Sequence, residues 1–456
     1  MRARVPGLVV GLMLSTALVA CTTTVPGEPI SQGRVIKEET TPGGVDPAGI
    51  VENTDGGEID RLAATVVEDL KVYWGGVFPE VFDKEFTDLK GGYYSVDTAD
   101  AESPKPPCTD SADEVEGNAF YCPTADVIAW DRAALLPVLK DRFGEAGVML
   151  VLAHEVGHAV QNRTGAGLAE RRAEPDRFPT ILIEAMADCY AGGFIRWVVD
   201  GNAERLQMRP DQLDAALAAM ISFRDPVGTE ASDRGAHGDA FDRASAFLDG
   251  YESGARLCSE MTVDNRTFTL SGFIDAGDQA RGGNIRFEEI VESITALLDP
   301  FFAEVAGESW RTPQLREIQD EPSCTRPQGP VAFCPDGSAI EVDVSAELPG
   351  IHAEIGDYAT GTLVAGRYAL ASLAAAGEPL SGPDAQRSAV CLTGAFTASL
   401  FEREQRFLSP GDMDEAVQVL LKYDYVARDV DGGAVESGFE RVSLFRQGFA
   451  EGAREC

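Results

Sequence analysis

The chain is short of basic side chains and of histidine. Its 456 residues hold 38 Lys and Arg against 75 Asp and Glu, a formal net charge of −37, and only four histidines. A field of that sign repels phosphate backbones, which excludes nucleic acid as a partner. Long apolar runs are also missing beyond residue 20, so no later segment has the length of a membrane span. The overall composition, 44% hydrophobic and 25% charged, is that of a globular protein.

The first twenty residues have the pattern of an export signal. Arg2 and Arg4 precede an apolar stretch at 7–20 that is too short to span a membrane comfortably. Its end, Leu-Val-Ala followed by Cys21, resembles a bacterial lipobox, in which the cysteine carries the lipid; an ordinary signal peptide ending near a cysteine is the alternative. We therefore expect a lipid anchor on Cys21, a location on the extracytoplasmic face of the cell membrane, and a flexible linker over 21–57.

No C-x-x-C pair occurs among the nine cysteines, which argues against zinc–thiolate sites. Export favours disulfides instead. The eight cysteines after Cys21 recur in the same order in the two halves of the chain, and CYAGGF in the first half matches CLTGAF in the second. This internal duplication predicts local pairing within each half. The expected pairs are Cys108–Cys122, Cys189–Cys258, Cys324–Cys334 and Cys391–Cys456.

The duplication also predicts the domain organisation. One unit occupies residues 58–258 and a second occupies 285–456, with a connector at 259–284 between them. Each unit is expected to be a mainly helical α+β domain with a small sheet.

Two of the four histidines stand four residues apart in the apolar, helix-periodic stretch GVMLVLAHEVGHAVQN. Positions i and i+4 share a helix face, so His154 and His158 can bind one metal ion while Glu155 lies beside the attacking water. A helix with two structural histidines is the alternative. Catalytic Zn²⁺ usually takes three protein ligands, so a third ligand is required further along the chain.

Glu184 is the predicted third ligand. It lies in a second helical pattern after His158, among apolar neighbours, and a buried carboxylate needs a partner. Asp188, one turn later, would accept a hydrogen bond from a ligand histidine and fix its tautomer. Glu170 and Glu174, in a polar arginine-rich stretch, are weaker candidates for the same position.

HEVGHAVQN followed by E-x-x-A-D-C-Y-A-G resembles the family of bacterial neutral zinc metallopeptidases, and the E-x-x-x-D spacing resembles the wider gluzincin group. The resemblance covers about residues 58–258. It extends to the C…FYCP segment from Cys108 and to His237-Gly238 before a helix leading to Cys258. It implies a zincin-like domain with Zn²⁺ as the cofactor and a peptide or protein as the substrate. Family members often have a second His where this chain has Ala159, and they usually carry one unit.

The other two histidines have different expected roles. His237 is a candidate donor to the oxyanion that forms during peptide hydrolysis, with a loop or helix-start histidine as the alternative. His352, alone in the second half, is predicted to be structural. The strand pattern at 120–131 is a candidate edge strand for an extended substrate, best at Val127–Trp130, with a simple core strand as the alternative.

The second half keeps the cysteines and helix patterns but loses the metal residues. Aligning the halves places Gly366, Arg367 and Leu370 opposite His154, Glu155 and His158, and places Gln386 and Val390 opposite Glu184 and Asp188. We expect a degenerate unit that keeps the fold and has no active site.

Together these features predict a lipid-anchored zinc metalloendopeptidase. Glu155 would take a proton from the water that Zn²⁺ activates and pass it to the leaving amine. Two other classes stay open. A non-catalytic zinc-binding scaffold lipoprotein is one, although metal storage would need no general base at Glu155. A zinc amidase acting on cell-wall peptides is the other, and it would use the same site.

Overall fold

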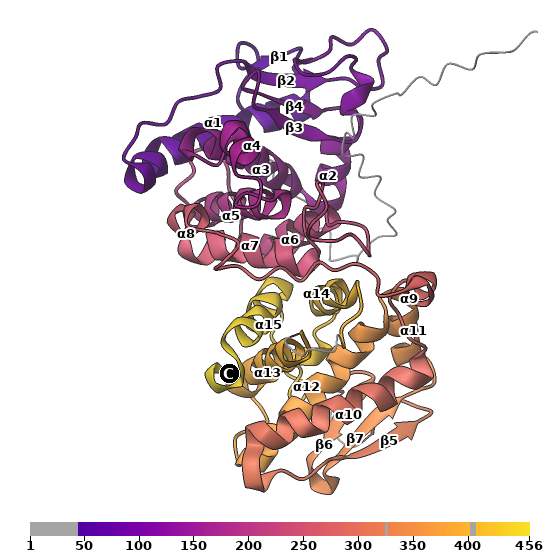
Figure 1. Cartoon of the computed structure of the whole chain (residues 1–456). Helices are drawn as coiled ribbons and strands as arrows, with labels where there is room; N and C mark the ends of the chain where they lie inside the picture. The colour runs from indigo at the N-terminus through magenta and orange to yellow at the C-terminus, as the bar shows by residue number, and fades with distance from the viewer. Residues whose placement is uncertain (1–43, 324–326, 402–406) are drawn as a thin grey trace, which may run out of the picture.

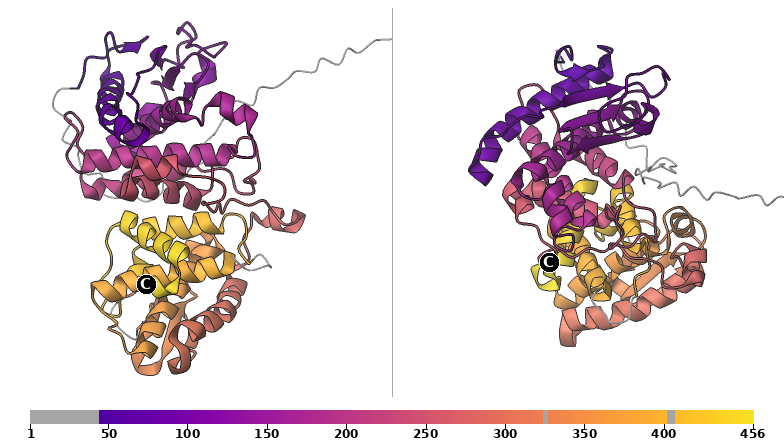
Figure 2. Two further views of the ribbon diagram at one scale, coloured as in Figure 1. Left: turned by 60° about the vertical axis from the view of Figure 1, so that its left-hand side comes forward. Right: turned by 45° about the horizontal axis from the view of Figure 1, so that its top comes forward.

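The computed structural model describes residues 44–323, 327–401 and 407–456, which form two helical halves stacked one on the other (Figure 1). Each half carries a small sheet on the side away from the other half, so helices make the contact between them (Figure 2). This is the mainly helical α+β architecture expected from the sequence. The predicted signal and the lipidation site Cys21 lie outside the described residues. No helix in the described ranges is long and apolar enough to cross a membrane.

The sheet of the first half has the strand order β1-β2-β4-β3. Strands β1 (Val51–Glu52), β2 (Gly92–Val96) and β4 (Val127–Asp131) run parallel, and β3 (Ala119–Cys122) pairs antiparallel with β4. The expectation that Val127–Trp130 forms an edge strand is wrong, because β4 is paired on both sides and buried throughout. Its unbroken apolar run is typical of a central strand with both faces covered. The edge strand is β3.

The linker predicted at 21–57 is too long. Residues from 44 onward are described, and Val51 is buried as part of β1 beside β2. The backbone N–H of Asp55 donates to the Asp60 carboxylate at the start of the first helix. A strand of two residues gives no alternating pattern, so the composition of this stretch alone could not reveal it.

Helices α3 and α5 lie at the centre of the first half, and β3, α1, α6 and α7 pack around them. The eight helices are α1 (Glu58–Phe82), α2 (Leu135–Phe143), α3 (Glu145–Thr164), α4 (Leu168–Ala173), α5 (Thr180–Val199), α6 (Leu213–Ser222), α7 (Ala240–Ser253) and α8 (Ala255–Ser259). Helices α5 and α7 approach closely at Gly250, where a Cβ atom would lie 1.7 Å from the carbonyl oxygen of Cys189. Only glycine allows that approach.

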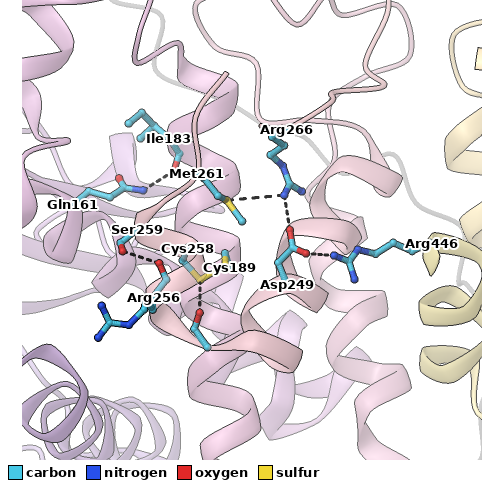
Figure 3. The surroundings of a disulfide bond; sticks show 11 residues. Gln161, Ile183, Cys189, Asp249, Arg256, Cys258, Ser259, Met261, Arg266 and Arg446 are labelled. Atoms are coloured by element: carbon cyan, nitrogen blue, oxygen red, sulfur yellow. Dashed lines mark hydrogen bonds and ion pairs between the residues drawn. A yellow bond between two sulfur atoms is a disulfide. The ribbon is translucent and has the colours of Figure 1, made fainter. Parts of the chain in front are cut away.

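Three of the expected cysteine pairs are bonded in the described structure. Cys108–Cys122 fixes a loop to β3, Cys189–Cys258 joins α5 to α8, and Cys391–Cys456 joins the corresponding helix of the second half to the C-terminus. Figure 3 shows the second of these bonds and its surroundings. The fourth expected pair includes Cys324, which lies outside the described residues.

The second half repeats the order of elements of the first, except that its described residues contain no counterpart of β1 or α4. It contains α9 (Ala276–Arg281, within the predicted connector), α10 (Phe287–Ala306), β5 (Gln314–Ile318), β6 (Val331–Cys334), β7 (Ala339–Asp343), α11 (Glu347–Glu354), α12 (Asp357–Ala376), α13 (Pro383–Phe401), α14 (Asp412–Lys422) and α15 (Gly438–Glu451). Its sheet has the order β5-β7-β6, with a parallel and an antiparallel pair placed as in β2-β4-β3.

Two details of packing also recur. The register in which β6 pairs with β7 is that of β3 with β4, residue for residue along the aligned sequences. Gly448 on α15 meets the carbonyl of Cys391 on α13, just as Gly250 on α7 meets Cys189 on α5. The first half is therefore matched by the second in topology, register and helix contact.

Buried carboxyl groups give the fold a predictable pH dependence. Burial, with repulsion from neighbouring acids, raises the pKa of Asp239, Asp412 and Glu415 well above the ordinary range and that of Asp414 to about 6. A raised folded-state pKa means that these groups stabilise the fold fully below about pH 4 and lose that contribution as the pH rises through the folded-state value. With zinc saturating, we expect the free energy of unfolding to be at least about 2 kcal/mol lower at pH 8 than at pH 5.

Denaturant unfolding at the two pH values measures this difference. The Asp414→Asn variant removes one of the titrating groups and should reduce the pH dependence. Equal stability at both pH values, or greater stability at pH 8, would contradict the burial of these groups as acids.

Candidate metal centre

Three side chains from α3 and α5 converge on one point. The Nε2 atoms of His154 and His158 lie 3.1 Å apart, and the Glu184 Oε2 atom lies 3.2 Å and 3.4 Å from them. All three ligand atoms fall within 4.8 Å of one another. Two imidazole nitrogens and a carboxylate oxygen form a donor set that suits catalytic Zn²⁺ and leaves a position for water or substrate. The residues expected from the sequence as ligands thus lie together and fit zinc.

Further contacts hold the two imidazole rings by their other nitrogen. His154 Nδ1 lies 2.6 Å from Asp188 Oδ1, and His158 Nδ1 lies 3.0 Å from Gln161 Oε1. Because Nδ1 is bonded in both rings, Nε2 is the nitrogen left for the metal. Gln161 is itself fixed, since its amide donates to the carbonyl of Ile183 at 2.6 Å.

Asp188 is fully buried and is neutralised by Arg243 on α7. The guanidinium of Arg243 donates to both carboxylate oxygens at 2.7 Å and 2.8 Å, and a third bond of 2.7 Å goes to the carbonyl of Phe223. Burial opposes ionisation of Asp188, but Arg243 and His154 outweigh it and hold the pKa of the carboxyl below its usual range. A chain of charged contacts therefore runs from α7 through α5 to the ligand on α3.

The three candidate ligands perturb one another's pKa values strongly. Burial disfavours protonated His154, but the carboxylates of Asp188 and Glu184 outweigh it and raise the pKa of His154 to about 9. Burial likewise opposes ionisation of Glu184, yet the neighbouring histidines hold its pKa well below the ordinary value. The cluster thus favours positive charge at its centre, and a bound cation would displace the proton on His154.

Glu155 is not among the converging ligands. It is 7% exposed, and the nearby backbone N–H of Tyr121 in β3 favours its ionised form. Burial raises its pKa above the ordinary value, more than the nearby histidines lower it. A carboxylate beside a metal centre is suited to general base catalysis when its pKa is raised toward neutral pH.

A family model with the description "Putative neutral zinc metallopeptidase" matches residues 12–260 of the chain. That range is more than half of the sequence and contains His154, Glu155, His158, Glu184 and Asp188. The chain belongs to this family of zinc metallopeptidases. Zinc as the metal and peptide bonds as the class of substrate follow from that membership. Comparison with curated proteins and with solved structures finds no match.

An open cleft leads to the candidate metal centre. Its wall combines β3 and the turn after it with α3 and α4; the lining residues are Tyr121, Pro123, His158, Gln161, Asn162, Ala166, Gly167, Leu168, Arg171 and Glu184. Arg171 adds a positive charge that interacts with Glu184. Neither Glu170 nor Glu174, the weaker candidates for third ligand, belongs to the metal-binding group.

His237 lies in the loop before α7, outside the ligand group. Its backbone N–H donates to the Asp225 carboxylate at 2.6 Å, and its Nδ1 lies 3.3 Å from the same carboxylate. Its charge helps to lower the pKa of Glu184, so the ring lies within electrostatic reach of the centre. Gln161, Arg243 and Asp225 are site residues that the sequence-based prediction missed. Only Gln161 had a local signal, because it follows His158 by one helical turn.

The second half has no counterpart of the metal centre among its described residues. Arg367, opposite Glu155 in the alignment, is buried on α12 and donates to Gln328 and to three backbone carbonyls. In the described part of the chain, a second group of side chains is close enough together to hold a metal ion: Asp357, Asp412 and Glu415. This group lies at the starts of α12 and α14, not at the positions aligned with the first metal centre. His352 lies in α11, with its Nε2 atom 3.0 Å from the carbonyl oxygen of Ile285.

Proposed function

We propose that the chain is a zinc metalloendopeptidase, held by lipid on Cys21 at the extracytoplasmic face of the cell membrane. The observation that carries the catalytic part is the convergence of His154, His158 and Glu184 beside a separate buried carboxylate, Glu155, at the end of a cleft. A pure storage site would need the ligands but not that fourth group. The lipobox-like segment and the two arginines before it support the location.

In this mechanism the chain's own residues position the substrate and move one proton. Zn²⁺ held by the three ligands would polarise the scissile carbonyl and acidify a water. Glu155 accepts the proton of the attacking water and later delivers it to the leaving amine. The nearby Tyr121 N–H favours the ionised carboxylate that the first step needs. His237 is the candidate donor to the developing oxyanion, held by Asp225 in the loop before α7.

The edge strand β3 offers a place for an extended peptide. Its free edge faces away from β4, and Tyr121 within it lines the cleft together with His158. A substrate that adds to this edge would run past the metal centre by main-chain hydrogen bonds, without a requirement for one particular sequence. Arg171, which also lines the cleft, favours substrates with a carboxylate near the cleaved bond.

The first test is metal content and its link to cleavage. We expect one zinc ion per chain, loss of peptide cleavage on chelation, and recovery when Zn²⁺ is added back. Glu184→Ala should lower zinc affinity by more than about 100-fold, because one of three ligands is gone. Equilibrium dialysis and a fluorogenic peptide library measure the two quantities.

Controls separate the possible outcomes. Glu174→Ala changes an exposed carboxylate outside the ligand group and should bind zinc as the wild type does. Zinc binding with no cleavage of denatured protein or peptides would contradict the peptidase proposal. Cleavage of purified peptidoglycan peptides alone would assign the site to an amidase instead.

A further inference from the structure

The two halves meet through equivalent helices. Helices α6 and α7 of the first half face α14 and α15 of the second, as Figure 1 and the contacts between these elements agree. In the sequence, RPDQLDAALAAMISFRD at α6 matches SPGDMDEAVQVLLKYD at α14, and FDRASAFLDGY at α7 matches FERVSLFRQGF at α15. Each half thus uses the same surface to contact the other.

The contacts across this surface are reciprocal at the helix starts. Asp214 on α6 accepts hydrogen bonds from the backbone N–H groups of Gly438 and Phe439, which begin α15. Asp414 on α14, at the aligned position, accepts one of 2.6 Å from the N–H of Ala240, which begins α7. Each aspartate therefore binds the free N–H groups at the start of the other half's helix.

The aromatic side chains follow the same exchange. When a ring on α7 contacts a ring on α15, the residues aligned with those two rings also contact each other across the interface. The reciprocal pairs are Phe241–Phe445 (5.9 Å) with Phe247–Phe439 (6.4 Å), and Phe241–Phe449 (4.7 Å) with Tyr251–Phe439 (4.9 Å). An interface in which residue i contacts j and the copy of j contacts the copy of i is the isologous interface of a two-fold dimer.

Charged contacts at the edge of the surface break that symmetry. Arg446 of α15 pairs with Asp249 and with Glu252 on α7, and Asp249 also binds Arg266 from the connector (Figure 3). These pairs have no aligned equivalents, because the second half carries Gln447 and Ala450 at the positions of Asp249 and Glu252. They specify the second half as the partner rather than another copy of the first.

On the first-half side, the reciprocal contact leads to the metal centre. Asp414 Oδ2 lies 3.3 Å from Arg224 Nε, and the preceding carbonyl, that of Phe223, accepts a bond from Arg243. The following residue, Asp225, accepts from the N–H groups of His237 and Gly238. Asp414 therefore holds both the segment 223–225 and the start of α7, the two supports of Arg243.

On the second-half side, the same contact leads to no such centre. Arg441 on α15 is the aligned equivalent of Arg243, and it donates only to backbone carbonyls, among them those of Leu420 and Val435. The position of its acidic partner is Val390. Asp214 thus supports a helix of the same kind with no link to a metal ligand, which makes it a matched control within the same molecule.

We infer that the second half occupies the place of the second subunit of a two-fold dimer, fused into one chain, and that its Asp414 positions the metal centre through Arg243 and Asp188. Asp414 is a positioning residue, since it touches neither ligand nor cleft. The inference rests on the proposed metal centre, so its main readout is zinc release, which can be followed without substrate.

The experiment compares Asp414→Ala with Asp214→Ala in the full chain. Zinc release to a chromogenic chelator should be about tenfold faster in Asp414→Ala than in the wild type, the scale seen when outer contacts of a ligand histidine are lost. Asp214→Ala should release zinc within about twofold of the wild type, while its melting temperature falls by a similar amount to that of Asp414→Ala. In peptide cleavage, kcat should fall in Asp414→Ala with KM unchanged.

Two further variants keep the test decisive if Asp414→Ala does not fold. Asp414→Asn keeps an acceptor for the Ala240 N–H and should restore part of the slow zinc release. Arg224→Gln removes only the ion pair and should speed zinc release by about threefold. Equal zinc release in the Asp414 and Asp214 variants would overturn the inference and leave the peptidase proposal standing. Failure of the wild type to cleave any peptide would contradict the peptidase proposal but not the difference in zinc release.

Discussion

Glu155→Gln is expected to lower kcat for peptide cleavage by a factor of about 10²–10⁴ while zinc stays bound, because the amide cannot accept the proton of the attacking water. The three converging ligand atoms belong to other residues, so the zinc site keeps its donors. Glutamine has nearly the same size and keeps an oxygen near the Tyr121 N–H, so the local structure should persist. Single-turnover cleavage and metal content, measured on the same preparation, check both halves of this expectation.

Glu184→Gln is the matched comparison, since it makes the same chemical change at a ligand. It should lose zinc and activity together, whereas Glu155→Gln should lose activity alone. A Glu155→Gln protein that cleaves peptides at the wild-type rate would remove Glu155 from the mechanism and return the site to a metal-binding role.

Asp188→Ala is the second change with a large expected effect, because it removes two interactions at once. The buried guanidinium of Arg243 loses its carboxylate, and leaving one member of a buried pair alone costs about 3–5 kcal/mol of stability. His154 loses the acceptor that holds its ring, which should weaken zinc binding by roughly 10–100-fold. Denaturant unfolding of the metal-free protein and zinc titration separate the two effects.

The controls for Asp188→Ala lie on the same helix. Asp200, at the end of α5, pairs with Arg196 in an exposed ion pair, and Asp200→Ala should change stability by less than about 1 kcal/mol. Asp188→Asn keeps the shape of the side chain but not its charge, so its loss of stability should lie between those of Asp188→Ala and Asp200→Ala. Wild-type zinc affinity in Asp188→Ala would show that the orientation of His154 does not depend on this carboxylate.

The parts of the site that the sequence predicts are those set by helix periodicity. His154, Glu155 and His158 follow from one helix, and Glu184 with Asp188 from another, because spacing along a helix determines a shared face. The sequence does not predict the role of Arg243, because its contact with Asp188 joins helices that are far apart in the sequence. An arginine in an amphipathic helix also has no distinctive local pattern. His237 was identified as a candidate, but the Asp225 that holds it was not.

The fold shows the same division. The mainly helical architecture and the three described cysteine pairs were expected from repeated motifs. The sequence does not predict that β4 lies inside the sheet, because an apolar run such as Val127–Trp130 does not indicate whether a strand has one neighbour or two. The reciprocal contacts of Asp214 and Asp414 could not be expected, since an alignment of the halves shows which residues are equivalent but not which surfaces meet.

The contact between Asp414 and the start of α7 has a consequence for how the protein works at low abundance. Two separate subunits would have to associate, and the fraction of subunits in the dimer would fall with dilution. Within one chain the partner is present at an effective concentration of the order of millimolar, whatever the number of molecules. The metal centre of each chain would therefore stay supported even at low protein concentration. Residues of the second half, such as Arg367, are then free of any catalytic requirement.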